Sequence, residues 1–175
     1  MYIEILILYQ LNFKQKHGYE IKKEVENILG EKYSINNNML YPILKHFEDM
    51  GAVQKQIEQQ EGKPNRHIYT ITEIGVEILL ELIRDFPEDI ASNDHEFLVR
   101  VGLLDLLDIQ TRKEILHTRK VVIEKNLSHT KNIKAYNLDK HYLFPYKVIE
   151  FQITQIELEL QWISELQKEC MAKSF

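Results

Sequence analysis

Apolar residues recur at the three- and four-residue spacing of a helix in the first third of the chain. The first such stretch predicts a helix over residues 2–11, and the second predicts a helix over 19–29 that stops at Gly30. A third helix is expected to begin after Asn36, a residue type that caps helices well, and to run to Met50. The residues expected to face the core in the first two helices are Ile3, Leu6, Ile7 and Leu11, then Ile21, Val25, Ile28 and Leu29.

After Met50 the pattern changes to an alternation of apolar and polar residues. Residues 53–57 and 68–72 both alternate in this way, which is typical of half-buried strands. The segment between them contains Gly62 and Pro64, which favour turns, and its tip is polar and basic. These features predict a two-stranded hairpin.

Helical spacing returns after the hairpin. Thr72 is placed to cap a fourth helix, which begins its apolar stripe at Ile74, extends to about Arg84 and is closed by Pro87. Three helices, a hairpin and a further helix in this order make a winged helix-turn-helix. We therefore expect a winged-helix domain over residues 1–87.

The rest of the chain is expected to be helical. Residues 93–175 form the second predicted domain, with a short helix over 95–108, a long polar helix over 111–137 and a last helix over about 143–171. The expected fold class is therefore mainly α, with a small β-hairpin wing and a C-terminal helical dimerisation domain.

The last helix carries the clearest periodic pattern of the chain. Its apolar residues recur at alternating three- and four-residue steps, as in the seam of a coiled coil. A second apolar stripe lies alongside, so the helix needs two partners: a neighbouring helix and a second copy of the protein. We expect the seam to form the interface of a homodimer. The seam consists of Tyr146, Ile149, Ile153, Ile156, Leu160 and Ile163, and the second stripe of Phe151, Leu158, Trp162 and Leu166.

The charge balance complicates a role in nucleic-acid binding. The formal net charge is −5, and residues 1–90 hold 10 Lys/Arg against 15 Asp/Glu, whereas residues 91–175 hold 12 of each. Binding to a phosphate backbone depends on local charge, because screening at physiological salt acts over about 8 Å. The basic residues of the first half are clustered, at Lys14, Lys16, Lys22 and Lys23 and again in the hairpin. Such lysines are either a solvated face or phosphate contacts.

Two faces are expected on the third helix. Leu40, Ile43, Leu44 and Phe47 face the core, which leaves a polar face for solvent or a ligand. Asparagine on that face either caps the helix or pairs with adenine in a major groove. Tyr41 is either a phosphate donor or a half-buried aromatic, and Pro42 predicts a loose or bent first turn.

No catalytic or metal-binding pattern emerges. The seven His residues are scattered, Cys170 is the single cysteine, and neither a glycine-rich phosphate loop nor a paired-carboxylate motif is present. We expect no enzyme activity, no metal and no cofactor. The apolar run at the N-terminus contains Glu4 and is too short to cross a bilayer, so we interpret it as a buried helix of a cytoplasmic protein with no membrane partner.

Three stretches resemble the signature motifs of the PadR family of transcriptional regulators. They are HGYEI from His17, LYPILKHFEDMG from Leu40 and EGKPNRHIYTITEIG from Glu61, and their order and spacing match that family over about 75 residues. The C-terminal half, with WISEL at Trp162, is similar to the helical dimerisation region of its longer members. Asn38 and Met39 stand where the family usually has small residues, and the wing carries Lys63-Pro64-Asn65-Arg66 where arginine is commoner.

The resemblance implies a homodimer that binds a double-stranded DNA operator. It also implies release by a small phenolic or aromatic effector, for which Trp162 marks a candidate pocket. The alternative, which its place in a packed stripe favours, is that Trp162 is a core residue. A winged helix that binds another protein instead of DNA is the alternative. The expected DNA-contacting residues are Tyr19, Lys22, Asn36, Asn37, Asn38, Tyr41, Lys45, Lys63, Asn65 and Arg66.

Overall fold

The computed structural model describes residues 1–30, 34–59, 66–136 and 143–172. The chain divides into two compact units, Met1–Asp85 and Phe86–Phe175, and each is described by itself. No helix in the described ranges is both long enough and apolar enough to cross a membrane.

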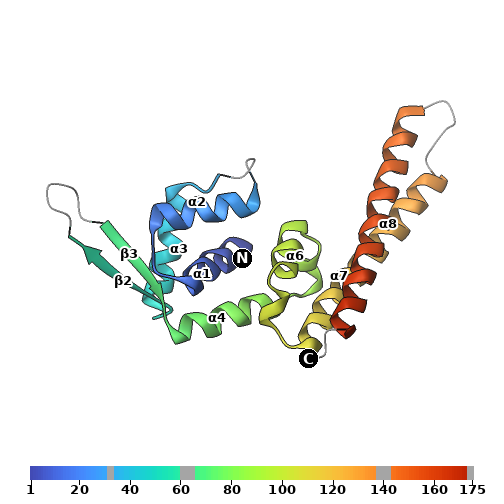
Figure 1. Ribbon diagram of the computed structural model, residues 1–175. Coiled ribbons are helices and arrows are strands. Elements are labelled where there is room, and N and C mark those ends of the chain that lie inside the picture. Colours follow the sequence, from blue (N-terminus) through green and yellow to red (C-terminus); the bar gives the residue numbers. More distant parts are fainter. Residues whose placement is uncertain (31–33, 60–65, 137–142, 173–175) are drawn as a thin grey trace. The chain divides into compact units, whose positions relative to one another are not determined.

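The first unit is a winged helix, as the sequence predicts. Strands β2 and β3 form an antiparallel ribbon beside α3, in which Val53 pairs with Ile71 and Glu58 pairs with Arg66 (Figure 1). The elements of this unit are α1 (Tyr2–Phe13), β1 (Lys16–His17), α2 (Gly18–Leu29), α3 (Asn37–Asp49), β2 (Val53–Glu58), β3 (Arg66–Ile71) and α4 (Glu73–Arg84).

Strand β1 was not expected. Residues 16 and 17 lie in the segment that the sequence pattern assigns to a loop, but they pair with β3 and complete a sheet of order β1-β3-β2. Lys16 pairs with Tyr69, and His17 pairs with Ile68. A two-residue strand has too few residues to show alternation, so only its distant partner reveals it.

Helix α1 lies at the centre of this unit. Ile5, Leu6, Ile7 and Leu8 are all buried, so more than one face of the helix is covered. The helix contacts α2, α4 and β3. The remaining apolar core comes mainly from Leu11, Ile21, Val25, Ile35, Leu40, Leu44, Phe47, Leu79 and Ile83.

Two residues expected in the core are exposed. Ile28 lies in the last turn of α2 and Ile74 in the first turn of α4, and about half of each side chain is accessible. The apolar periodicity thus continues into the last turn of α2 and the first turn of α4, but no other described element covers the stripe there. Periodicity defines the direction of a side chain but not the extent of the element that covers it.

Helices α3 and α4 begin at the predicted caps. The Asn36 side chain accepts a hydrogen bond from the Met39 amide at 2.9 Å. Thr72 accepts one from the Gly75 amide at 3.1 Å, and its hydroxyl donates to the Gly51 carbonyl at 2.7 Å. A Cβ on Gly75 would lie 2.2 Å from the Ala52 carbonyl oxygen, so the close approach of α4 to the start of the wing requires glycine. Helix α3 is continuous through Pro42.

The second unit is entirely helical in its described part. The short helix expected over 95–108 is split, because a regular helix ends at Gly102 and only a 3-10 turn follows. Helices α7 and α8 pack against each other (Figure 1). Helix α5 contacts both α6 and α7. The elements are α5 (Glu88–Ala91), α6 (Asp94–Val101), η1 (Leu104–Leu106), α7 (Ile109–Tyr136) and α8 (Leu143–Ala172).

Helix α8 has one covered and one open apolar stripe. Within the seam, Ile163 is fully buried inside this unit and the other five residues are half-buried. The open stripe contains Phe151 and Leu158, which are 62% and 66% exposed. Three further apolar residues near the start of the helix are also exposed: Leu143, Phe144 and Val148.

Candidate nucleic-acid interface

The polar face of α3 is open, as predicted. Asn37, Asn38, Tyr41 and Lys45 are all exposed. At about 3.6 residues per turn these four positions fall within roughly a third of the helix circumference. The opposite face carries the buried Leu40, Leu44 and Phe47. One helix thus presents two amides, a phenol and an ammonium in one direction while its apolar face holds it in the core.

The three asparagines have different surroundings. The carbonyl oxygen of the Asn36 side chain is occupied by the helix cap. Neither Asn37 nor Asn38 makes a side-chain hydrogen bond to any residue that the structure describes. Two amide groups are therefore available to an external partner, one turn from Tyr41.

Lys45 is not an isolated charge. Its ammonium lies 2.6 Å from the Asp49 carboxylate and 3.7 Å from that of Glu48. The hydrogen bond and charge of Asp49, with a smaller contribution from Glu48, raise the pKa of Lys45 above its usual value. A partner that uses Lys45 must compete with these carboxylates.

A cavity of about 500 Å³ opens where α2, α3 and the wing meet. Its walls carry hydroxyl, imidazole and guanidinium groups, which can donate hydrogen bonds to an anion. The lining residues are His17, Gly18, Tyr19, Tyr41, Arg66, His67 and Tyr69.

Contacts among these side chains hold the cavity in shape. The guanidinium of Arg66 lies over the Tyr19 ring, 5.8 Å from its centroid. The His17 ring stacks on the same tyrosine ring, with the two ring centroids 5.7 Å apart. His17 Nδ1 lies 3.1 Å from the carbonyl oxygen of His67. Burial, followed by the neighbouring Tyr41 and Glu48, raises the pKa of Tyr69, so its phenol stays protonated at neutral pH.

Sequence reasoning did not find His17, His67 and Tyr69. The signal that would have found them is the pairing of β1 with β3, which brings His17 and Ile68 opposite each other. Of the expected residues, Tyr19 and Arg66 are exposed, and Lys22 is half-buried with its ammonium 3.8 Å from Glu26. Lys63 and Asn65 lie outside the described residues.

Lys16 corrects the predicted basic cluster. It was considered with Lys14, Lys22 and Lys23 as a solvated or phosphate-binding lysine, but it is only 2% exposed. Its ammonium donates to Gln10 at 2.7 Å and forms an ion pair with Glu24. The strand β1 turns this side chain inward, which a loop assignment could not reveal.

The expected effector residue lines a cavity in the second unit. Trp162 is half-buried, and its ring makes an edge contact with Phe97 at 6.0 Å. The cavity has a volume of about 710 Å³ and lies among residues of α6, α7 and α8. Among the described residues, no group of three or more His, Cys, Asp or Glu side chains has metal-binding geometry.

The fold and this interface define a winged-helix protein. A family model described as the transcriptional regulator PadR-like family matches residues 7–81. The match covers a little under half of the chain and includes most of the winged-helix unit. The matched family is described as one of transcriptional regulators.

Two curated proteins are similar to the chain in sequence. The chain is 25% identical over 87 residues to the "Uncharacterized protein X" of Lysinibacillus sphaericus, a match covering 50% of this chain and 80% of that protein. It is 27% identical over 114 residues to the negative transcriptional regulator PadR of Bacillus subtilis (strain 168). This second match covers 65% of the chain and 62% of the regulator, which is less than two thirds of its length.

Solved structures are also similar. Bacillus subtilis PadR in complex with operator DNA is 19% identical, with a TM-score of 0.44 and coverage of 95% of this chain and 98% of that one. A transcriptional regulator from Clostridium thermocellum is 26% identical, with a TM-score of 0.42 and coverage of 46% and 77%.

Proposed function

We propose that this protein is a cytoplasmic homodimer that binds a specific double-stranded DNA sequence and thereby regulates transcription. One observation carries the proposal: the open face of α3 lies beside a donor-lined cavity to which α2, α3 and β3 all contribute. A helix with exposed amides next to a cavity lined by hydrogen-bond donors is the combination that reading a DNA groove requires.

In this arrangement α3 occupies the major groove. Asn37 and Asn38 supply amide groups, which pair with the N6 and N7 atoms of adenine. Tyr19, Tyr41 and Arg66 surround the adjoining cavity and donate to a backbone phosphate, which positions the helix. Lys63 of the wing, which lies outside the described residues, adds a further charge contact.

The homodimer is supported by α8. A monomer would leave several large apolar side chains of this helix in water, which isolated soluble proteins rarely do over a contiguous patch. The seam from Tyr146 to Ile163 is largely covered inside the protomer, so the open stripe containing Phe151 and Leu158 adds apolar surface for the second copy. The interface thus combines the half-buried seam residues with this stripe.

An effector that releases the DNA completes the proposal. The Trp162 cavity is large enough for a small aromatic molecule and lies wholly within the second unit. Binding there would be coupled to DNA affinity reciprocally, since each ligand must change the affinity for the other by the same factor.

The test is a fluorescence-anisotropy titration at several salt concentrations, with a duplex selected from a random pool and a scrambled duplex. A palindromic site with half-sites about 34–36 Å apart, or a multiple of this, is expected for a dimer. Arg66→Ala should weaken binding to both duplexes and reduce the log–log salt slope by roughly one. Asn38→Ala should cost about 1–3 kcal/mol on the selected duplex and much less on the scrambled one.

Matched controls use the same residue types elsewhere in this unit. Arg84 is exposed at the end of α4, and Asn27 is exposed on α2, so Arg84→Ala and Asn27→Ala should leave both affinities unchanged. A wild-type protein without salt-sensitive DNA binding or duplex preference would favour the protein-interaction module instead.

A further inference from the structure

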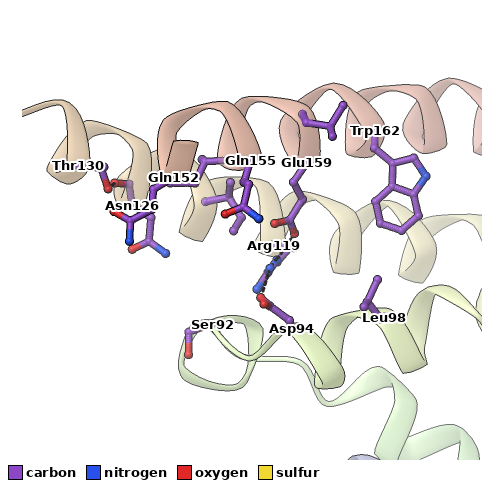
Figure 2. A pocket seen from close by; sticks show the side chains of 13 residues that line it. Ser92, Asp94, Leu98, Arg119, Asn126, Thr130, Gln152, Gln155, Glu159 and Trp162 are labelled. Atoms are coloured by element: carbon purple, nitrogen blue, oxygen red, sulfur yellow. Dashed lines mark hydrogen bonds and ion pairs between the residues drawn. The ribbon is translucent and has the colours of Figure 1, made fainter. Parts of the chain in front are cut away.

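The wall of the Trp162 cavity contains an ionic cluster around a buried arginine. Figure 2 shows Asp94 of α6 and Glu159 of α8 pointing at Arg119 of α7 from opposite sides. Arg119 is only 1% exposed, and its guanidinium carbon lies 5.1 Å from the centre of the Phe97 ring. The cluster therefore forms one wall of the cavity, with the arginine behind the two acids.

All three nitrogens of the guanidinium already donate to protein groups, and the side chain is almost inaccessible to solvent. Its Nε donates to Glu159 at 2.7 Å, Nη1 to the Ala91 carbonyl at 2.7 Å and Nη2 to Asp94 at 2.6 Å. Although burial alone lowers the pKa of Arg119, the hydrogen bonds and charges of Glu159 and Asp94 outweigh burial and raise it. An incoming carboxylate would have to displace one of these partners to reach the arginine.

The two acids are not saturated. Each uses one oxygen, Asp94 Oδ1 or Glu159 Oε1, to bind Arg119. The second oxygen of each makes no hydrogen bond to a described residue of the chain. A carboxylate can accept several hydrogen bonds, so both retain acceptor capacity toward the cavity.

The net charge of the lining is negative. Two carboxylates and one guanidinium give −1, and every other lining residue is uncharged. The nearby lysines of α7 do not alter this balance, because Lys125 is paired with Glu88 at 2.6 Å and Lys131 with Glu157 at 2.8 Å.

The remaining walls suit an aromatic body. Trp162, Leu98, Ile123 and Ile156 supply apolar surface, and an indole ring attracts a cation more strongly than other aromatic rings do. Amide groups of Asn126, Gln152 and Gln155 line the opposite end, as Figure 2 shows, and can bond a hydroxyl.

We propose that this cavity binds a small aromatic organic cation, whose amine pairs with Asp94 and Glu159 and whose ring packs beside Trp162. This assignment deepens the proposed effector site by naming the charge of its ligand, and it rests on that part of the proposed function; the titration without DNA tests it separately from DNA binding. It selects against an aromatic carboxylate of the same size, which would meet a like-charged wall and a guanidinium buried behind the two acids.

Trp162 is the only tryptophan of the chain, so its fluorescence reports on the cavity. The full-length protein is titrated at pH 7, without DNA, with tyramine and with 3-(4-hydroxyphenyl)propionate, which share a phenol and a short chain but differ in charge. Tyramine is expected to quench saturably, and calorimetry should give it at least a ten-fold higher affinity than the carboxylate. Equal or tighter binding of the carboxylate, or no binding of tyramine, would overturn the proposal.

Charge variants test the assigned residues. Asp94→Asn neutralises the lining charge while keeping a carbonyl oxygen for Arg119, and it should reduce tyramine affinity several-fold and leave the carboxylate unaffected or better bound. Glu169→Gln removes the same charge from an exposed position of α8 outside the lining, and it should change neither affinity. Circular dichroism verifies that both variants are folded. Unchanged tyramine affinity in folded Asp94→Asn protein would reject the site.

Discussion

The ring of Tyr41 lies directly against Gly18. A Cβ placed on Gly18 would stand 3.0 Å from Cε1 and 3.1 Å from the hydroxyl oxygen of Tyr41. Because Gly18 has no side chain, the Tyr41 hydroxyl of α3 can lie against the start of α2. Because Tyr41 is partly exposed, it can move away when residue 18 becomes larger.

Replacing Gly18 with alanine should consequently separate stability from DNA binding. We expect Gly18→Ala to fold with unchanged or slightly higher stability, since alanine is favoured over glycine in a helix by about 0.5–1 kcal/mol. The displaced Tyr41 should lower DNA affinity about as much as Tyr41→Phe does, at all sequences. Anisotropy titrations and urea unfolding measure the two effects. Gly102→Ala, whose Cβ would meet nothing closer than 3.5 Å, is the control for the substitution itself. Unaltered DNA affinity in Gly18→Ala would contradict a role for Tyr41.

The buried Lys16 predicts a loss of stability and not of DNA contacts. Lys16→Met should lower the free energy of unfolding by about 1–3 kcal/mol, because Gln10 and Glu24 lose a charged donor in a region of low exposure. Lys14→Met, at an exposed position two residues earlier, should be neutral. If Lys16 instead contacted phosphate, its replacement would reduce the salt slope of DNA binding without changing urea unfolding.

The open stripe of α8 predicts how the proposed dimer can be dissociated. Phe151→Glu should yield a monomer at micromolar concentration, where wild type is expected to be a dimer, since it places a charge in the proposed apolar interface. Ile57→Glu changes an equally exposed apolar residue of the wing and should leave the mass unchanged. Sedimentation equilibrium distinguishes the two, and residues 1–90 alone should sediment as a monomer. A dimer that persists in Phe151→Glu would exclude this stripe from the interface.

The start of α7 predicts a pH effect. Asp108 accepts hydrogen bonds from the Thr111 hydroxyl at 2.7 Å and from its amide at 2.9 Å, and these bonds lower the pKa of Asp108. A lowered folded-state pKa means that the ionised form stabilises the fold, so this stabilisation is complete above the unfolded value of about 3.9. It is lost as the pH falls through the lower folded-state pKa.

Asp108→Ala should accordingly have a lower thermal midpoint than wild type at pH 6, and the difference should shrink below about pH 4 as Asp108 becomes protonated in wild type. Thermal unfolding between pH 2.5 and 7 measures this. Asp89→Ala, which removes an exposed acid from α5, should not reproduce the profile. A difference in thermal midpoint that is independent of pH would show that Asp108 stabilises the start of α7 without a contribution from its charge.

Much of the winged helix could be predicted because its signals are local. Asn36 and Thr72 cap the predicted helices, Gly51 follows α3 with a positive φ of 72°, and alternation marks β2 and β3. Each of these depends on a few neighbouring residues, whose backbone and hydrogen-bonding preferences are the same in any fold. The open polar face of α3 follows in the same way from its buried Leu40, Leu44 and Phe47.

The sites themselves depended on contacts between distant residues. The pairing of His17 with Ile68 buries Lys16 and brings His17 to Tyr19 and His67, although a two-residue strand has no pattern of its own. Arg119, Asp94 and Glu159 come from three helices, and each reads in the sequence as an ordinary surface charge. Periodicity reports the direction of a side chain relative to its own element. Which group it meets there is decided by packing, because burial and pairing are properties of the assembled core.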